Sequence, residues 1–540
     1  MNVDPQDAAP REAQGASPAE HAPWKPRANP WIIAASVMIS TFMVVLDSSV
    51  ANVALPHIAG NLSATNDEAT WVLTSYLVSN AIMLPATGWL TRRLGRKRLL
   101  MSSIVLFTGA SLLCGMAVNM PMLILSRILQ GVGGGGMQPL AHATLLESFP
   151  PRQHGTAMAV YGVGVVVAPV VGPTLGGWIT DSYSWRWIFY INLPVGLLAL
   201  VMASLFIEDP PYLQRHAEES IDYQGFTLMA LWLGSLQLIL DKGQEADWFG
   251  APWICWTAAL SVLSFVGFIW RELTCHEPIV RLGVLKERNF SVGTVIAALY
   301  GFILYGSTAL LPLFLQTLLG YPAMASGLSV SPRGVGAMIS MSVAGMLSGY
   351  VDPRLTLSAG LGLFSISTLM LAHLNLGIAM SSVMLPNLIN GFSSGLIFVP
   401  LTTMAIGHLR QQEIGNATGI YNLMRNIGGS VGIAVVSTMQ VRHSQVHQNY
   451  LVAQLTGSSP RTRHLLHSMT AHFQSMGADP TTAAHRALVS LSSLAHQQAL
   501  LLSYMDIFRM VGYLALVCVP ATMLFERVAR KPSPRRGSAK

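Results

Sequence analysis

Charged residues are scarce in this chain: only 11% of its 540 residues are Asp, Glu, Lys or Arg, compared with about 25% in soluble domains. Hydrophobic residues make up 51%, and apolar blocks of roughly 20 residues, the length that crosses a bilayer as a helix, recur along the sequence. So little charge cannot cover the surface of a soluble protein of this size. We therefore predict an all-α protein that crosses a membrane many times.

Cysteine is also scarce, and its placement is not typical of disulfides. The four cysteines lie in or beside apolar blocks, so no disulfide framework is expected. The net charge of +7 does not indicate a nucleic-acid partner, because the basic residues cluster in short loops between apolar blocks. Such clusters are typical of the cytoplasmic loops of membrane proteins.

A hydropathy window of about 19 residues predicts fourteen membrane-spanning helices. Their approximate positions are 31–53, 68–90, 98–118, 122–146, 155–178, 187–207, 222–241, 252–271, 291–315, 325–348, 355–373, 380–403, 415–438 and 505–528. Alternation from a cytoplasmic N-terminus places the five basic residues of the segment 88–100 inside. The predicted outer loops without Lys or Arg are 54–67, 119–121, 316–324 and 374–379. This asymmetry predicts that both termini are cytoplasmic.

An internal repeat divides the chain into two halves. The matching residues are Gln130, Gly131 and Gly135 with Asn390, Gly391 and Gly395, and Gly155, Ala157 and Tyr161 with Gly415, Ala417 and Tyr421. The shift is constant over two successive helices, although small residues are common in membrane helices and single matches arise by chance. Two parallel six-helix halves separated by an inserted helix pair would give this pattern.

The repeat and the hydropathy together predict five regions. They are a disordered cytoplasmic tail (1–30), an N-terminal six-helix half (31–207), an inserted helix pair with a cytoplasmic linker (208–271), a C-terminal six-helix half (272–528) and a basic cytoplasmic tail (529–540). Within the C-terminal half, the polar segment 439–504 is expected to form a long periplasmic loop that holds one or two surface helices.

Asp47 lies inside the first apolar block, where a carboxylate costs roughly 2.5–3.5 kcal/mol on insertion scales. We interpret it as a proton-binding site in a central cavity, with structural hydrogen bonding as the alternative. Arg127, in the fourth predicted helix, needs a partner such as Asp47 or a substrate anion, unless it caps nearby carbonyl groups. Gln130, Gly131 and Asn52 are further candidates for lining the cavity.

Two glycine-containing segments are candidates for moving parts. In the fifth predicted helix, prolines remove backbone donors beside small residues, which favours a hinge over randomly tolerated prolines. The hinge candidates are Gly164, Pro169, Gly172, Pro173, Gly176 and Gly177. The loop between the second and third helices is a topology anchor, a gating element or both, and its candidates are Gly88, Arg92, Gly95, Arg96 and Lys97.

The remaining embedded charges are Arg425, Asp506 and Arg509, which we regard as secondary candidates. In the polar outer segment, His443 and His447 are four residues apart, a spacing that suits metal ligands. No cysteine or neighbouring acid in the sequence completes a site, so a solvated loop is expected instead. We predict no metal site, no catalytic residues and no cofactor.

These segments resemble the EmrB/QacA branch of the major facilitator superfamily, the fourteen-helix drug:proton antiporters, over about residues 31–528. The resemblance is carried by LDSSVANVALPHIAGNL in helix 1, GWLTRRLGRKRLL between helices 2 and 3, SRILQGVGGGG in helix 4, and APVVGPTLGG followed by WRWIFYINLPVG. The arginine of the helix 4 motif is linked to proton coupling in the family. Arg92 departs from the pattern, since the superfamily usually has an Asp there that latches the two halves, although EmrB-like members also tend to be basic.

The resemblance implies a proton-coupled exporter of hydrophobic or amphipathic toxic compounds in a bacterial inner membrane. EmrB-like members work with a periplasmic adaptor and, through it, an outer-membrane channel, so these are the expected partners. A dedicated exporter of one metabolite class, such as a fatty acid, siderophore or peptide, is the alternative on the same fold. A membrane-embedded enzyme or sensor is disfavoured, because no P-loop or HExxH motif occurs and the embedded charges are spread one per helix.

Overall fold

The computed structural model describes residues 26–210, 222–275, 277–348, 350–456 and 459–526, and this part of the chain contains helices and no strands. The first half contains α1 (Pro30–Asn61), α2 (Asn66–Leu94), α3 (Arg96–Gly115), α4 (Met120–Gly135), α5 (Met137–Ser148), α6 (His154–Ser182), α7 (Trp187–Tyr190) and α8 (Asn192–Phe206). The inserted pair is α9 (Tyr223–Lys242) and α10 (Pro252–Thr274).

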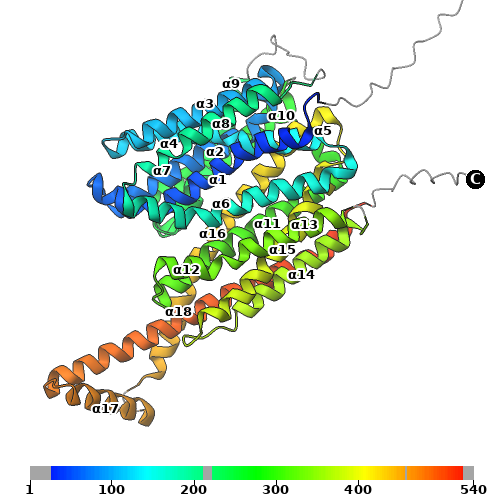
Figure 1. Cartoon of the computed structure of the whole chain (residues 1–540). Helices are drawn as coiled ribbons and strands as arrows, with labels where there is room; N and C mark the ends of the chain where they lie inside the picture. The colour runs from blue at the N-terminus through cyan, green and yellow to red at the C-terminus, as the bar shows by residue number, and fades with distance from the viewer. Residues whose placement is uncertain (1–25, 211–221, 276, 349, 457–458, 527–540) are drawn as a thin grey trace, which may run out of the picture.

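The second half contains α11 (Arg288–Leu313), α12 (Ala323–Val330), α13 (Pro332–Leu347), α14 (Pro353–Leu371), α15 (Met380–Ile406), α16 (Gln411–Gln454), α17 (Pro460–Ser475) and α18 (Pro480–Ala521). Short turns of other helix types are η1 (Pro151–Gln153), η2 (Trp248–Gly250), η3 (Leu282–Lys286), η4 (Phe314–Leu318) and η5 (Thr522–Leu524). The helices pack into one elongated bundle (Figure 1).

Every predicted span coincides with one of these helices or with two that follow each other directly. Within the described residues, ten helical segments are long and apolar enough to cross a membrane. The other four predicted spans correspond to α2, to α4 with α5, to α12 with α13, and to the first part of α16. The chain is a multi-pass membrane protein, while the total of fourteen crossings stays a prediction.

Local sequence explains where several helices begin. The side chains of Asn29 and Asn119 accept hydrogen bonds from backbone N–H groups of the first turns of α1 and α4, which otherwise lack partners. Thr65 and Glu68 form a reciprocal capping box at the start of α2. Gly95, with φ of 83°, ends α2 and allows α3 to start at the next residue.

The internal repeat is visible as the same small-residue packing in both halves. Gly131 of α4 lies against α2, where an added Cβ would overlap Ser79, and Gly391 of α15 lies against α13, where a Cβ would overlap the Arg333 carbonyl. The inserted helices α9 and α10 pack on each other, and α9 also contacts α2 and α16. The pair therefore lies beside the junction of the two halves.

The outer segment differs from the expected long loop. The two flanking helices continue through most of it, so that α16 is 44 residues long and α18 is 42. Together with α17 they project beyond the rest of the bundle (Figure 1). On α18 the buried positions recur every four residues, which gives a narrow face for packing against its neighbours. These residues are Ala483, Ala487, Leu491, Ala495 and Ala499.

Parts of the predicted regions lie outside the described residues. These are residues 1–25 of the N-terminal tail, residues 211–221 of the linker before α9, and residues 527–540 of the C-terminal tail.

Candidate functional site: a buried charged network

The structure places Asp47 at the centre of a polar network inside the N-terminal half. One carboxylate oxygen lies 2.6 Å from Arg127 Nη1 and forms an ion pair. The other oxygen accepts hydrogen bonds from Gln130 Nε2 at 2.8 Å and Asn192 Nδ2 at 2.7 Å. Asp47 is 2% exposed and the other three residues at most 1%. Four side chains from α1, α4 and α8 therefore satisfy one another in a site closed to solvent.

Arg127 is fixed on several sides. Its Nε donates to the backbone carbonyl of Val72 in α2 at 3.0 Å, and Nη1 also donates to Gln130 Oε1 at 2.7 Å. The guanidinium lies over the rings of Tyr76 and Phe189, 4.3 Å and 5.6 Å from their centroids. These contacts offset much of the cost of burying the cation, although Nη2 has no hydrogen-bond partner of its own.

Asn192 was missed as a site residue by the sequence analysis, although its segment YINLPVG was recognised as a motif. Its amide bonds both Asp47 and, at 3.0 Å, Ser111 Oγ of α3. Ser111 in turn donates to the carbonyl of Phe189 at 2.8 Å. A polar residue within an apolar run was the available signal, since such residues in membrane helices usually face the bundle interior.

Of the other cavity candidates, Gly131 packs α4 against α2 and makes room for Arg127 to approach the Val72 carbonyl. Asn52 lies on an exposed part of α1 and is not a member of the hydrogen-bond network around Asp47.

The small residues of the predicted hinge place α6 directly against α1. An added Cβ at Gly172 would overlap Ser49, one at Gly176 would lie 2.9 Å from Val50, and one at Gly164 would lie 2.9 Å from Met38. Ser49 Oγ also approaches the Pro169 carbonyl at 3.5 Å. Gly177 faces open space. Pro173 lies within α6, and its side chain is outside the described part of the structure. Close contact with α1 connects this motif to the helix that carries Asp47.

The predicted loop 88–100 is instead the end of α2 and the start of α3 with only Gly95 between them, and contacts at one end of the bundle hold it in place. Arg96 and Glu147 form a buried bidentate ion pair at 2.6 and 2.7 Å, which joins α3 to α5. Lys97 donates from its backbone to Asp209 at 2.8 Å and from Nζ to the Ser204 carbonyl at 2.5 Å. These bonds fix the loop to the N-terminal half.

Other residues of this loop reach across to the second half. Arg92 Nη2 donates to the Pro278 carbonyl at 3.3 Å. Gly88 approaches the backbone of Asn416 on α16 so closely that an added Cβ would lie 2.9 Å from its Cα. Asn416 also exchanges two hydrogen bonds with the backbone of Arg281.

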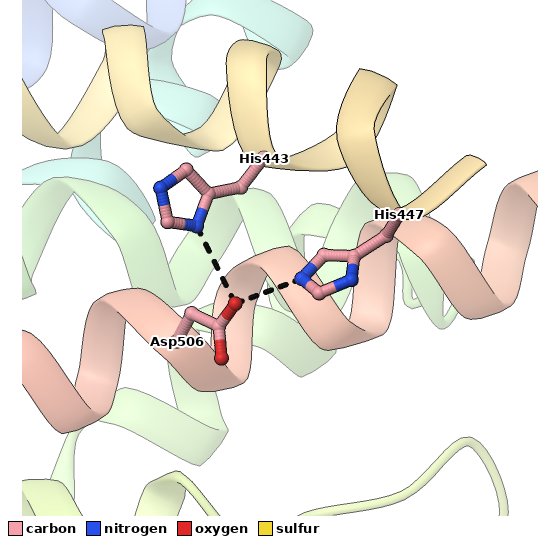
Figure 2. Close-up of side chains that lie close together, drawn as sticks. All are labelled: His443, His447 and Asp506. Carbon is pink, nitrogen blue, oxygen red and sulfur yellow. Dashed lines mark hydrogen bonds and ion pairs between the residues drawn. The ribbon is translucent and has the colours of Figure 1, made fainter. Parts of the chain in front are cut away.

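Further contacts between the halves lie near the same end. His142 of α5 is 3.1 Å from Asn422 of α16, and Arg425 donates to Gln138 Oε1 at 3.4 Å. Gly155 at the start of α6 contacts Ser348, just after the end of α13. Arg425 is therefore a residue of the junction between the halves and lies apart from the Asp47 network. Asp506 contacts His443 and His447 where α16 and α18 run together (Figure 2), and Arg509 contacts Asp506 alone among these residues.

Comparisons with known proteins identify the class to which this fold and its buried network belong. Residues 37–433 match the family model described as Major Facilitator Superfamily, and the chain belongs to that family of membrane transporters. It is 34% identical to the "Multidrug export protein EmrB" of Haemophilus influenzae, over 90% of this chain and 94% of that protein.

A second relative is the "Fatty acid resistance protein FarB" of Neisseria gonorrhoeae, 34% identical over 94% of this chain and 97% of that protein. Among solved structures, the proton:xylose symporter XylE aligns with a TM-score of 0.58 and 15% identity, over 91% of this chain and 94% of XylE. This last similarity concerns the fold alone. The predicted fold class and family are confirmed, and the chain is a transporter related to efflux proteins.

Proposed function

We propose that this protein is a proton-coupled antiporter that exports hydrophobic or amphipathic toxic compounds across the bacterial inner membrane by alternating access. The single observation that carries the proposal is the buried Asp47–Arg127 ion pair. A charge pair closed to solvent within a membrane bundle is expensive to desolvate, and such residues usually mark ion or proton pathways. The relationship to multidrug export proteins supports the class of substrate.

The geometry suggests how proton binding would be coupled to movement. Asp47 accepts three hydrogen bonds from Arg127, Gln130 and Asn192. A proton on this carboxyl would place a donor in a group that now only accepts, and would weaken the charge-assisted bond from Arg127. Protonation would also remove the attraction between α1 and α4 that the ion pair supplies. The proton would thus shift the balance between two arrangements of α1 and α4, provided that it binds Asp47 more tightly in one arrangement than in the other.

The contacts between the halves support a state closed at the end that carries the α2–α3 loop. If that end is cytoplasmic, as the distribution of Lys and Arg predicts, Gly88, Asn416 and the bonds from Arg92 belong to a cytoplasmic gate. Opening this gate would separate α2 from α16. The close packing of α6 against α1 would carry the change between this end and Asp47.

The proposal is tested by dye uptake into inverted membrane vesicles, with and without an imposed proton gradient. Wild-type protein should transport only with the gradient, and equal amounts of Asp47→Asn or Arg127→Ala protein should not. Transport that is indifferent to the gradient would disprove proton coupling. Normal gradient-driven transport by Asp47→Asn would remove this residue from the mechanism.

A dedicated exporter of one metabolite class is the second candidate function. It is favoured by the 34% identity to a fatty acid resistance protein, which equals the identity to the multidrug exporter. Growth of cells with and without the protein, on a panel of dyes, antibiotics, detergents and long-chain fatty acids, separates the two. Protection against several unrelated classes supports the multidrug exporter, and protection against fatty acids alone supports the second candidate.

We further propose that the projecting α16–α17–α18 segment contacts a periplasmic adaptor, through which an outer-membrane channel would be reached. Its support is its position beyond the bundle (Figure 1) and its mostly exposed α17. Replacement of residues 455–479 by a short glycine–serine linker should abolish co-purification of the adaptor and leave vesicle transport intact. Unchanged co-purification would contradict this contact.

A further inference from the structure

Two histidines and one aspartate converge where α16 and α18 run side by side (Figure 2). His443 Nδ1 lies 3.4 Å from Asp506 Oδ2, and His447 Nε2 lies 2.8 Å from the same oxygen. All three potential ligand atoms lie within 4.8 Å of one another. Asp506 is distant from the histidine pair in sequence and meets it only in the folded chain, so the sequence alone does not reveal this acid.

The identity of these groups suits a divalent transition metal. Imidazole nitrogen with one carboxylate is a common ligand set for zinc, and the spacing of four residues puts both rings on one face of α16. In a tetrahedral site with metal–ligand bonds of about 2.0–2.1 Å, neighbouring ligand atoms lie about 3.3 Å apart. Two of the observed separations, 3.4 and 2.8 Å, are already close to this value. The third separation, between the two histidine nitrogens, is at most 4.8 Å.

The site is also accessible. The side chains of His443, His447 and Asp506 are 38%, 27% and 29% exposed, so the protein does not close over the cluster and leaves room for an ion and a further ligand. Arg509 Nη1, 3.5 Å from the other oxygen of Asp506, is the one cation that contacts this group among the described contacts. Its charge opposes a metal ion, and its side chain is 42% exposed, so it can turn away into solvent.

We propose that His443, His447 and Asp506 form a binding site for a divalent transition-metal ion of the zinc class. The metal joins α16 to α18 at the base of their projecting segment, next to the hydrogen bond from Ser503 to the Gln440 carbonyl. It would therefore fix the projecting segment relative to the C-terminal half. This site lies apart from the Asp47 network, and its existence does not depend on the proposed transport function.

The test uses the full-length protein, purified without a polyhistidine tag and freed of metal by a chelator that is then removed. Titration with Zn²⁺ in a calorimeter should show one saturable site. Co²⁺ should give the visible absorption of a tetrahedral nitrogen–oxygen complex. His443→Ala, His447→Ala and Asp506→Asn should each weaken Zn²⁺ binding by at least about tenfold.

The matched control is the second histidine pair, His464 and His467 on α17, three residues apart and distant from the site in sequence. His464→Ala should leave Zn²⁺ affinity unchanged, and Arg509→Ala should raise it by removing the opposing charge. Each variant is compared with wild type by thermal unfolding in the absence of metal, so that a misfolded variant is recognised. If wild-type protein shows no saturable Zn²⁺ site, or if Asp506→Asn and His464→Ala bind alike, the proposal is wrong and the cluster is only a hydrogen-bonded ion pair.

Discussion

The two halves of this transporter share a packing pattern and differ in charge. The shift that pairs Gln130 with Asn390 also pairs Arg127 with Asn387, so the C-terminal half has two neutral amides where the N-terminal half has a cation and an amide. Asn387 donates only to backbone carbonyls, those of Ser329 and Val383. The fold therefore does not require a charge at this position.

The same contrast appears in the ion pairs. Arg127–Asp47 and Arg96–Glu147, both in the N-terminal half, have side chains that are at most 3% exposed. In the C-terminal half, Arg288–Glu526 has side chains that are 58% and 61% exposed. Repeated small residues account for the shared fold. The buried Asp47–Arg127 pair lies where the C-terminal half has a neutral amide, so the shared fold does not need it, and we therefore propose that this pair serves transport.

The largest expected effect is on export, and it distinguishes the charged pair Asp47–Arg127 from Asn387, the neutral counterpart of Arg127 in the C-terminal half. Asp47→Asn and Arg127→Ala should reduce gradient-driven export to the background of empty vesicles, because each leaves the coupling pair without one of its charges. Asn387→Ala should retain most of the transport activity. Export is measured per amount of correctly inserted protein. Equal losses in Asn387→Ala and Asp47→Asn would remove the distinction between the halves.

The second effect compares a buried ion pair with an exposed one. Glu147→Gln should lower the free energy of unfolding by about 3–5 kcal/mol, because Arg96 is left buried without its bidentate partner. Glu526→Gln, which breaks the exposed pair with Arg288, should change it by about 0–1 kcal/mol. Denaturant unfolding in detergent measures both. Similar values for the two would show that burial does not set the strength of these pairs.

A smaller effect is expected at the amides. Asn192→Ala removes a hydrogen bond to the Asp47 carboxylate. It should lower the free energy of unfolding, measured with denaturant, by about 1.5–3 kcal/mol, the usual contribution of a hydrogen bond to a charged group. Asn390 has a buried Oδ1 without a hydrogen-bond partner, so Asn390→Ala should cost about 1 kcal/mol or less. Asn192→Ala should also reduce export, whereas Asn390→Ala should not. The reverse order in either measurement would contradict the assignment of Asn192 to the site.

The smallest expected difference between the halves lies in the shared packing, where both should respond alike. Gly131→Ala and Gly391→Ala should each destabilise by about 1–3 kcal/mol, because both introduce a methyl group into a close helix contact. Gly177→Ala, which faces open space, is the control and should be neutral or slightly stabilising. A large difference between the two repeat positions would show that the halves are not packed equivalently.

The sequence was sufficient for the class of fold and for the centre of the site. Long apolar blocks predicted the helices, and the charges within such blocks were rare enough that Asp47 was one of two candidate partners of Arg127, beside a substrate anion. The rest depended on contacts between distant segments. Nothing in the sequence pairs Asn192 with Asp47 or Glu147 with Arg96, because the two residues of each pair lie far apart along the chain and meet only in the folded protein.

The outer segment shows a different limit of sequence reasoning. Its polar composition suggested a loop, although the four-residue spacing of Ala483, Ala487 and Ala495 on α18 contained a helical signal. Within that segment, the metal-ligand spacing of His443 and His447 was recognised. Their acid, Asp506, was assigned to a membrane span and considered separately.

We propose that the charge of Asp47 couples proton movement to export, and proton movement in proteoliposomes measures this coupling. Purified protein is reconstituted with a pH-sensitive dye inside, and a transported substrate is added on one side without any imposed gradient. The account predicts substrate-driven proton movement for the wild type. For Asp47→Asn it predicts none, while exchange of labelled for unlabelled substrate persists. Proton movement of wild-type size in Asp47→Asn would contradict the account.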